Sequence, residues 1–237
     1  MELCFFNSVL TGMSCDGKAF TYVNQLASTE TDLSKREEWF TCACCPPNVT
    51  RTLGMLGGYL WSFDTDEDKS TAEINVHMYG SATLDISVGD QKVTLEQRSD
   101  WPWNGDIDFE LKSSQVNAQI RLRIPAWASE WTVSCCDCIG ITCTNATVSQ
   151  IEPAASDATI TKGYLQLSPD WLSHNPKFRL RIPLAPRKLR PHPYTNQDVV
   201  ALARGPIIYC LEDSDNKWVT DHFKVCLAHR MATVVRR

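Results

Sequence analysis

The chain has 237 residues, of which 43% are hydrophobic, so it is long enough to bury one sizeable core or two smaller ones. Its formal net charge of −5 gives it no basic character of the kind that nucleic-acid-binding proteins need. No apolar run reaches membrane-spanning length, which argues against an integral membrane protein. The 11 cysteines are an odd number, so at least one thiol is unpaired or metal-bound, and this favours a reducing compartment such as the cytoplasm.

The N-terminal region is predicted to begin with a helix. Over residues 2–13 the apolar side chains recur on one face, which is typical of a short amphipathic helix. This helix starts without a capping residue or a leading loop, which suggests that the chain opens inside a domain. Asp16-Gly17 indicates a turn, Ala19–Val23 is predicted to be a short strand, and the polar residues 28–38 are predicted to be a loop.

Three cysteines fall within four positions in the run Trp39–Arg51, and two prolines follow them at once. Pro46 and Pro47 have no N–H to donate, so they stiffen the turn that carries the thiols. Apolar residues at helical spacing then predict a helix from about Val49 to Trp61. Thiols close to a helix N-terminus feel its positive dipole end, which favours the thiolate, a nucleophile and a soft metal ligand. These thiols belong to Cys42, Cys44 and Cys45.

From Thr71 onward the apolar residues alternate with period two, which is typical of β-strands. Turn signals such as Asn104-Gly105-Asp106 separate the alternating segments. Many short strands at this spacing predict an antiparallel β-sandwich. The alternating segments are Ile74–Met78, Leu84–Val88, Val93–Gln97, Ile107–Leu111, Ile120–Ile124 and Trp131–Val133.

Three further segments complete this prediction. The charged run Asp64–Lys69 is interpreted as a solvated linker between the helix and the strands. Arg121–Pro125 is echoed by Arg179–Pro183, which fits neighbouring positions in one sandwich. Residues 199–211 are predicted to be one more buried strand pair, broken at Gly205-Pro206.

The cysteine run resembles the motif of the zinc-dependent cysteine glycosidases, the non-reducing-end β-L-arabinofuranosidase family of glycoside hydrolases. Members of that family carry a Cys-Ala-Cys-Cys-Pro-Pro-Asn segment like Cys42–Asn48. The resemblance extends over about residues 2 to 224. Other matching segments are Phe6–Leu10, Asp16–Lys18, Tyr22–Asn24, Trp101–Gly105, Leu122–Trp127 and Arg204–Tyr209.

This resemblance implies a mainly β chain with an α-helical N-terminal part. Residues 1–65 would be the last portion of an α/α six-hairpin barrel, which is the catalytic domain of the family. Residues 66–213 would form the antiparallel β-sandwich. Residues 214–237 would be the truncated start of a further module, because relatives continue into another β domain.

By the same resemblance, Cys44 is the catalytic nucleophile and also a zinc ligand, and Cys45 is a second zinc ligand. Zn²⁺ is therefore the implied cofactor, with two of the four ligands of a tetrahedral site present in this chain. Tyr22 and Asn24 approach the cysteine turn, so they and Cys42 are candidate substrate-binding residues.

The remaining parts of the family's site are not assigned to this chain. The family takes its other two zinc ligands from a Glu-x-Cys element and its acid/base from another glutamate, all upstream of the cysteine motif. Glu2-Leu3-Cys4 matches the Glu-x-Cys pattern. However, the family also has a glutamate five residues before the asparagine that Asn7 matches, and Glu2 fits that position. The match of Glu2-Leu3-Cys4 to the Glu-x-Cys pattern is therefore interpreted as accidental. The chain is therefore expected to be inactive by itself.

The alternative for each of these features is structural. The three thiols of the motif could be packed beneath the proline turn, and this alternative is strongest for Cys42. The second group of thiols, Cys135, Cys136, Cys138 and Cys143, is interpreted as incidental rather than as a metal site. The five scattered histidines, and Trp101, Trp103 and Trp127, are interpreted as structural residues.

The sequence therefore predicts a retaining exo-β-L-arabinofuranosidase that acts on arabinofuranosides of plant glycans or glycoproteins. Two other classes stay open. One is a catalytically dead β-sandwich fragment with a carbohydrate-binding or assembly role, and the other is a structural or redox protein that uses zinc and thiols alone. The β-sandwich domains of related enzymes often mediate dimers, so the resemblance also leaves a homodimer open.

Overall fold

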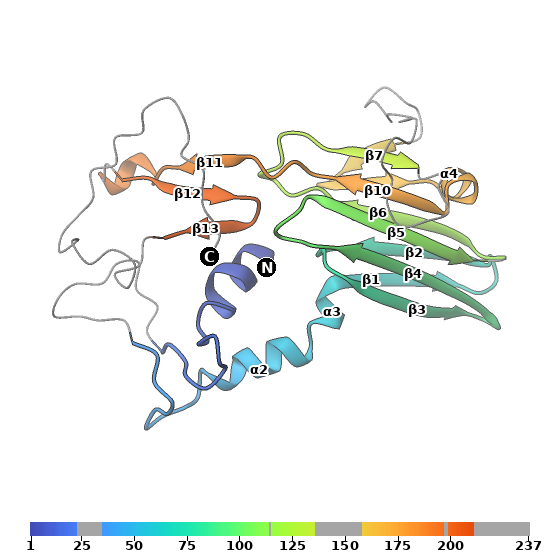
Figure 1. The fold of residues 1–237 in the computed structure, drawn as a ribbon. Helices are drawn as coiled ribbons and strands as arrows, with labels where there is room; N and C mark the ends of the chain where they lie inside the picture. Colours follow the sequence, from blue (N-terminus) through green and yellow to red (C-terminus); the bar gives the residue numbers. More distant parts are fainter. Residues whose placement is uncertain (23–34, 114, 136–157, 197–198, 211–237) are drawn as a thin grey trace.

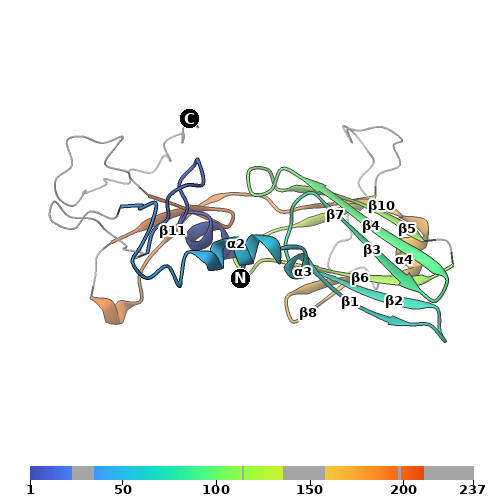
Figure 2. The same cartoon turned by 90° about the horizontal axis from the view of Figure 1, so that it is seen from below.

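Two five-stranded β-sheets make up most of the computed structural model, which describes residues 1–22, 35–113, 115–135, 158–196 and 199–210 (Figure 1). The strand orders are β1-β2-β6-β9-β8 in the first sheet and β3-β4-β5-β10-β7 in the second. The first sheet consists of β1 (Trp61–Asp66), β2 (Thr71–Val76), β6 (Asn117–Arg123), β9 (Tyr164–Leu167) and β8 (Ala158–Thr161). The second consists of β3 (Ala82–Val88), β4 (Gln91–Ser99), β5 (Asp106–Ser113), β10 (Lys177–Arg181) and β7 (Thr132–Cys135). Seen from below, the sheets form two layers (Figure 2).

One hydrophobic core lies between these two sheets. Along β4, Val93, Leu95 and Gln97 are fully buried while the residues between them are partly exposed, as period two predicts. The strand-rich character predicted from the sequence is thus confirmed. Burying an aliphatic side chain stabilises a fold by about 1.5–3 kcal/mol, so the inward-facing residues are its main support. The fully buried ones include Ile74, Ile120, Leu122 and Leu165 from the first sheet and Ile107 and Leu180 from the second.

The pairing within the sheets is not purely antiparallel, which corrects one prediction. β2 and β6 run parallel, with Thr71 opposite Asn117 and Val76 opposite Leu122. Alternation tells which face of a strand is buried, but it carries no information about the direction of the neighbouring strand. The two similar Arg-x-Arg-Ile-Pro segments lie in β6 and β10, which belong to different sheets, so they are not hydrogen-bonded neighbours.

The helix predicted from Val49 to Trp61 is divided and ends early. It consists of α2 (Pro47–Gly54) and the short α3 (Gly57–Leu60), and β1 already begins at Trp61. Two consecutive glycines at the start of α3 weaken the helix, because glycine has a low helix propensity. Aromatic side chains such as Trp61 favour a strand instead.

The predicted linker at Asp64–Lys69 is also wrong. Its first residues belong to β1, which pairs with β2 in an antiparallel hairpin. The charged residues form the turn of this hairpin, where the Lys69 ammonium lies 2.7 Å from a carboxylate oxygen of Asp66. The charges are solvated as expected, but they sit on a tight turn within a sheet.

A short helical segment opens the chain and contacts a separate third sheet. α1 (Glu2–Cys4) runs into a π-helical turn, η1 (Phe5–Val9), so the predicted helix is present but shorter than residues 2–13. The side-chain amide of Asn7 donates to the carbonyl of Pro206 and accepts from the N–H of Ile208, both at 2.8 Å. The third sheet has the order β11-β12-β13, and its strands are β11 (Pro186–Leu189), β12 (Ala201–Arg204) and β13 (Ile207–Tyr209).

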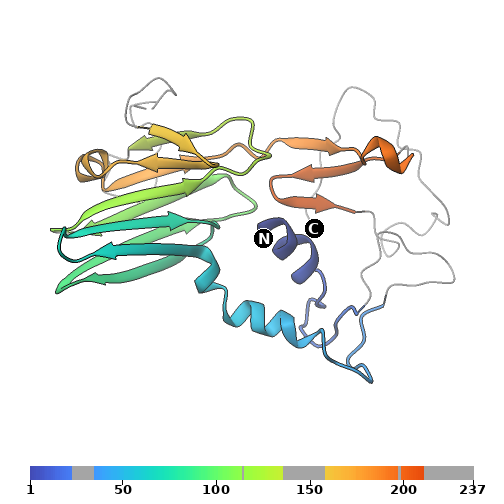
Figure 3. The ribbon, with the colours of Figure 1, turned by 180° about the vertical axis from the view of Figure 1, so that it is seen from behind.

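The strand pair predicted within residues 199–211 is therefore present as the β12–β13 hairpin, but it is not buried as predicted, since Ala203 is the one buried residue of its two strands. Its turn needs Gly205, whose φ of 57° lies in the left-handed region. The pair does not join either five-stranded sheet, contrary to the prediction. From behind, the third sheet lies beside the N-terminal helical segment and apart from the two large sheets (Figure 3).

The remaining elements are short. The strand predicted at Ala19–Val23 is reduced, in its described part, to isolated bridges that Phe20 makes with Met13 and Glu37. α4 (Pro169–His174) buries one leucine in the core, and η2 (Pro193–Thr195) is a single 3-10 turn. Within the described ranges, every helix is too short or too polar to span a bilayer. The domain limits at residues 65 and 213 stay a prediction, and residues 214–237 lie outside the described residues.

Candidate active site

The two adjacent thiols lie exposed on the turn that precedes α2. Pro46 is the N-cap of α2 and Pro47 is its first residue, so the ring constraints of both prolines shape the turn. The Asn48 N–H donates to the carbonyl of Cys45 at 3.0 Å. Its side-chain amide donates to the carbonyl of Cys44 at 3.4 Å, so one residue of the first helical turn braces the backbone of both cysteines.

Tyr22 is the side chain that contacts the thiol of Cys44. Its hydroxyl oxygen lies 3.2 Å from Cys44 Sγ, and its ring packs 5.1 Å from that of Phe40. Hydrogen bonding to Tyr22, and then to Cys45 and Cys42, holds the pKa of the Cys44 thiol below its ordinary value. Hydrogen bonding to Cys44, and then to Cys45, raises the pKa of Tyr22, so the phenol keeps its proton and donates it toward sulfur. Tyr22 therefore favours Cys44 as a thiolate.

This contact gives a first prediction, for the metal-free protein. Thiolate forms as pH rises through the pKa, so a Tyr22→Phe variant should move the midpoint of Cys44 alkylation by iodoacetamide to higher pH and slow alkylation at neutral pH severalfold. Peptide mapping assigns the alkylated residue among the cysteines. Tyr194→Phe, which removes a phenol from a side chain that is 95% exposed, is the matched control. An unchanged midpoint in Tyr22→Phe would contradict the role given to the phenol.

The spacing of the two thiols fits two corners of a tetrahedral metal site. Cys44 Sγ and Cys45 Sγ lie 3.6 Å apart. Zinc–sulfur bonds of about 2.3 Å at the tetrahedral angle separate two sulfurs by about 3.8 Å, close to this distance. Among the residues that the structure describes, no group of three or more His, Cys, Asp or Glu is arranged to hold a metal ion. The described residues thus fit half of a zinc site.

The other candidates from the sequence are placed as follows. Cys42 is exposed near Cys44, and Asn24 lies outside the described residues. Glu2 is buried, accepts a hydrogen bond from the Trp101 indole N–H at 3.1 Å and lies 2.8 Å from Arg123. These contacts give Glu2 a structural function. They agree with the interpretation that its match to the Glu-x-Cys pattern is accidental.

The members of the second group of thiols and the histidines that the structure describes have their contacts outside this site. Cys135 is a free thiol at the end of β7, and the other three cysteines of that group lie outside the described residues. His192 accepts from the N–H of Tyr194 at the start of η2, and His174 ends α4. His77 contacts Ser62 and Tyr164 instead. The contacts of Asn48 with the cysteine turn were not predicted from the sequence, although its place directly after the prolines made it a helix-start residue.

Comparison with known proteins matches three parts of the chain to three domains of one family. Residues 1–58 match the family model of the β-L-arabinofuranosidase GH127 catalytic domain, residues 73–184 the GH127 middle domain, and residues 186–235 the glycoside hydrolase family 127 C-terminal domain. A curated non-reducing end β-L-arabinofuranosidase of Bifidobacterium longum is 29% identical over 232 residues, which cover 91% of this chain and 32% of that protein. The chain thus spans about a third of the length of this relative.

Solved structures of the same glycoside hydrolase family superimpose on most of this chain. A GH127 β-L-arabinofuranosidase from Geobacillus stearothermophilus T6 superimposes with a TM-score of 0.71 at 26% identity, covering 91% of this chain and 33% of that one. A second GH127 β-arabinofuranosidase superimposes with a TM-score of 0.68, also at 26% identity, covering 90% of this chain and 33% of its own.

Proposed function

The chain belongs to glycoside hydrolase family 127, the β-L-arabinofuranosidases, and from this we propose that it contributes the nucleophile and two zinc ligands of a retaining exo-β-L-arabinofuranosidase. The substrates would be L-arabinofuranosides of plant glycans or glycoproteins, from which the enzyme releases the terminal sugar. The observation that carries the proposal is the exposed pair of Cys44 and Cys45, with the Tyr22 hydroxyl beside the first thiol.

The fold supports a division into a catalytic part and a β part. We propose that α1, η1, α2 and α3 are the last portion of an α/α six-hairpin barrel, because residues 1–58 match the catalytic-domain model. The two large sheets share one core, which supports the proposal that they form a β-sandwich. Residue 61, where β1 begins, would then be the junction between the two parts.

In the proposed reaction, the Cys44 thiolate attacks the anomeric carbon of the terminal sugar. The bond from that carbon to the leaving oxygen breaks, and the oxygen takes a proton from a general acid. Water then attacks the same carbon and gives its proton to the conjugate base of that acid. Cys44 leaves as a thiolate, so two inversions retain the anomeric configuration.

Within this scheme, the residues of this chain prepare the nucleophile. Tyr22 donates its O–H toward Cys44 and favours the thiolate, and Asn48 fixes the backbone that carries it. Cys44 and Cys45 would hold zinc, which when bound supplies a further lowering of the thiol pKa and a fixed orientation of sulfur. The general acid and two more zinc ligands are not assigned to described residues, so we expect the 237-residue chain alone to hydrolyse no arabinofuranoside.

A zinc titration of this chain tests the proposal. We expect one zinc ion to bind per chain with the thiols of Cys44 and Cys45 as ligands. A structural zinc site with four ligands contributes about 10–16 kcal/mol, so losing one thiolate should weaken binding by about a hundredfold or more. Competition with a chromophoric chelator measures the affinity of Cys44→Ala and Cys45→Ala. Cys210→Ala, which removes another exposed thiol, is the matched control and should bind like the parent chain.

Hydrolysis of an aryl β-L-arabinofuranoside by a longer protein that carries these residues tests the nucleophile. Activity that is lost in Cys44→Ala supports the enzyme. Zinc bound through both thiols without any hydrolysis would favour a structural zinc protein, and zinc affinity that is equal in all variants would contradict the metal site.

A further inference from the structure

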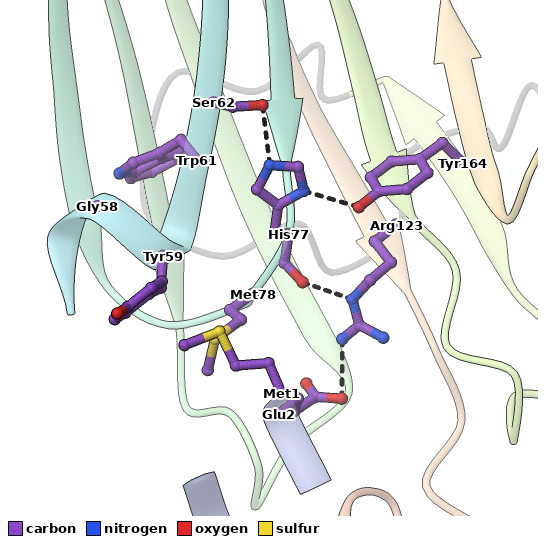
Figure 4. A pocket seen from close by; sticks show the side chains of 10 residues that line it. All are labelled: Met1, Glu2, Gly58, Tyr59, Trp61, Ser62, His77, Met78, Arg123 and Tyr164. Atoms are coloured by element: carbon purple, nitrogen blue, oxygen red, sulfur yellow. Dashed lines mark hydrogen bonds and ion pairs between the residues drawn. The ribbon is translucent and has the colours of Figure 1, made fainter. Parts of the chain in front are cut away.

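A pocket of about 360 Å³ lies between the N-terminal helical segment and the first sheet, away from the cysteine turn (Figure 4). Figure 4 shows two aromatic side chains on one side of it, an imidazole in the middle, and a phenol and a guanidinium on the other side. The residues that line it include Tyr59, Trp61, Ser62, His77, Arg123 and Tyr164. None of the thiols of the candidate active site lines it.

The imidazole of His77 joins two hydroxyl groups at this pocket. Its Nδ1 lies 2.7 Å from the hydroxyl oxygen of Tyr164, and its Nε2 lies 2.9 Å from Oγ of Ser62. Burial, and then the charge of Arg123, lowers the pKa of His77, so the ring is neutral at neutral pH. A neutral imidazole has one donor and one acceptor nitrogen.

This arrangement leaves one free donor and one free acceptor in either tautomer, although the two hydroxyl groups exchange these roles. If Nε2 carries the proton, it donates to Ser62, and Tyr164 donates to Nδ1. The Ser62 O–H and a lone pair of Tyr164 then stay free. If Nδ1 carries the proton, the Tyr164 O–H and a lone pair of Ser62 stay free, even though Asn75 also donates to Ser62 at 3.3 Å. The pocket thus always offers one donor and one acceptor, each on a hydroxyl whose position is fixed through His77.

The two charged side chains of the pocket, Arg123 and Glu2, neutralise each other. Arg123 lies 2.8 Å from a carboxylate oxygen of Glu2, and its Nε donates to the backbone carbonyl of His77. A pocket that binds an anion needs a cation without a carboxylate partner, and here the guanidinium already has one. The site therefore suits a neutral ligand.

We propose that this pocket binds a neutral sugar, one or two residues in size, at a site distinct from the cysteine turn. A pair of sugar hydroxyls supplies an acceptor and a donor that match those of Ser62 and Tyr164. The partly exposed ring of Tyr59 provides apolar surface for the C–H face of the sugar ring, and the buried ring of Trp61 lies behind it in the pocket wall. The volume lies near the lower end of the range of about 300–1,000 Å³ for small-molecule sites.

Calorimetric titration of the chain with L-arabinose and with a β-linked L-arabinofuranose disaccharide tests the proposal. We expect saturable binding that Ser62→Ala and Tyr164→Phe each weaken by about fivefold to tenfold, since each removes one hydrogen-bonding hydroxyl. Ser62 is exposed, so its alanine variant should fold like the parent chain. Ser87→Ala on the exposed face of β3 and Tyr194→Phe are matched controls and should bind normally.

The cysteine turn is tested separately in a Cys44→Ala, Cys45→Ala chain, which should bind the sugar as tightly as the parent chain. Binding that is lost in this double variant but unchanged in Ser62→Ala would place the sugar at the cysteines and overturn the proposal. No saturable binding up to about 100 mM sugar, or preferential binding of inorganic phosphate, would overturn it as well. The outcome for sugar binding at this pocket does not decide the proposed glycosidase function, since that function depends on the cysteine turn.

Discussion

A Gly105→Ala variant is expected to lose most or all of its folded population. Gly105 is buried in the connection directly before β5, and its carbonyl accepts from the N–H of Ile182 at 2.9 Å. A Cβ at this position would lie 1.9 Å from the backbone oxygen of Ile182. The clashing atom belongs to the backbone directly after β10, the strand that pairs with β5, so it cannot rotate away as a side chain could. We expect a loss of more than about 4 kcal/mol, measured by urea unfolding monitored by circular dichroism.

Gly80→Ala is the matched control for this substitution. Gly80 also lies in the connection between two strands, but a Cβ there meets nothing within 4 Å. Its unfolding free energy should stay within about 1 kcal/mol of the parent value. If Gly105→Ala unfolded at the same urea concentration as Gly80→Ala, the close approach of the two backbones would not exist in solution.

The strands could be predicted from the sequence because their signal is local. In β4 the alternation of Val93, Leu95 and Gln97 with polar residues reports a buried face directly, even where the inward residue is a glutamine. The β2–β6 pairing has no such signal, since Thr71 and Asn117 are separated in the chain by three strands of the other sheet. The third sheet was not predicted for a similar reason, because the side chains of a short hairpin alternate in the same way whichever sheet it belongs to.

The candidate site could be located because its residues are adjacent in sequence. Cys44 and Cys45 share one turn, and the prolines after them predict the start of α2. The approach of Tyr22 was expected, but its contact with sulfur depends on the chain folding back over 22 positions. The sugar pocket gave no sequence signal, because Ser62, His77 and Tyr164 come from β1, the end of β2 and β9. Only the fold brings their polar groups within 3 Å of one another.

Replacing Glu2 by alanine should destabilise the protein far more than replacing an exposed glutamate. The Glu2 side chain is 5% exposed, lies 2.8 Å from Arg123 and accepts from the Trp101 indole at 3.1 Å. Glu2→Ala would leave a largely buried guanidinium without its counter-charge and an indole N–H without an acceptor. Breaking one side of such a buried pair costs about 3–5 kcal/mol. Urea unfolding monitored by tryptophan fluorescence, which Trp101 should report, measures this loss.

The same strand provides the matched control. Arg121, two residues before Arg123 on β6, pairs with Glu73 at 2.5 Å, but both side chains are more than a third exposed. Glu73→Ala should therefore cost no more than about 1 kcal/mol, because water and salt screen the pair. Equal losses of unfolding free energy in the two variants would contradict the inference that Glu2 stabilises the contact of the N-terminal helical segment with Arg123 and Trp101. Zinc titration of folded Glu2→Ala adds a second readout: a structural glutamate leaves zinc affinity unchanged, whereas a drop of about a hundredfold would make Glu2 a metal ligand after all.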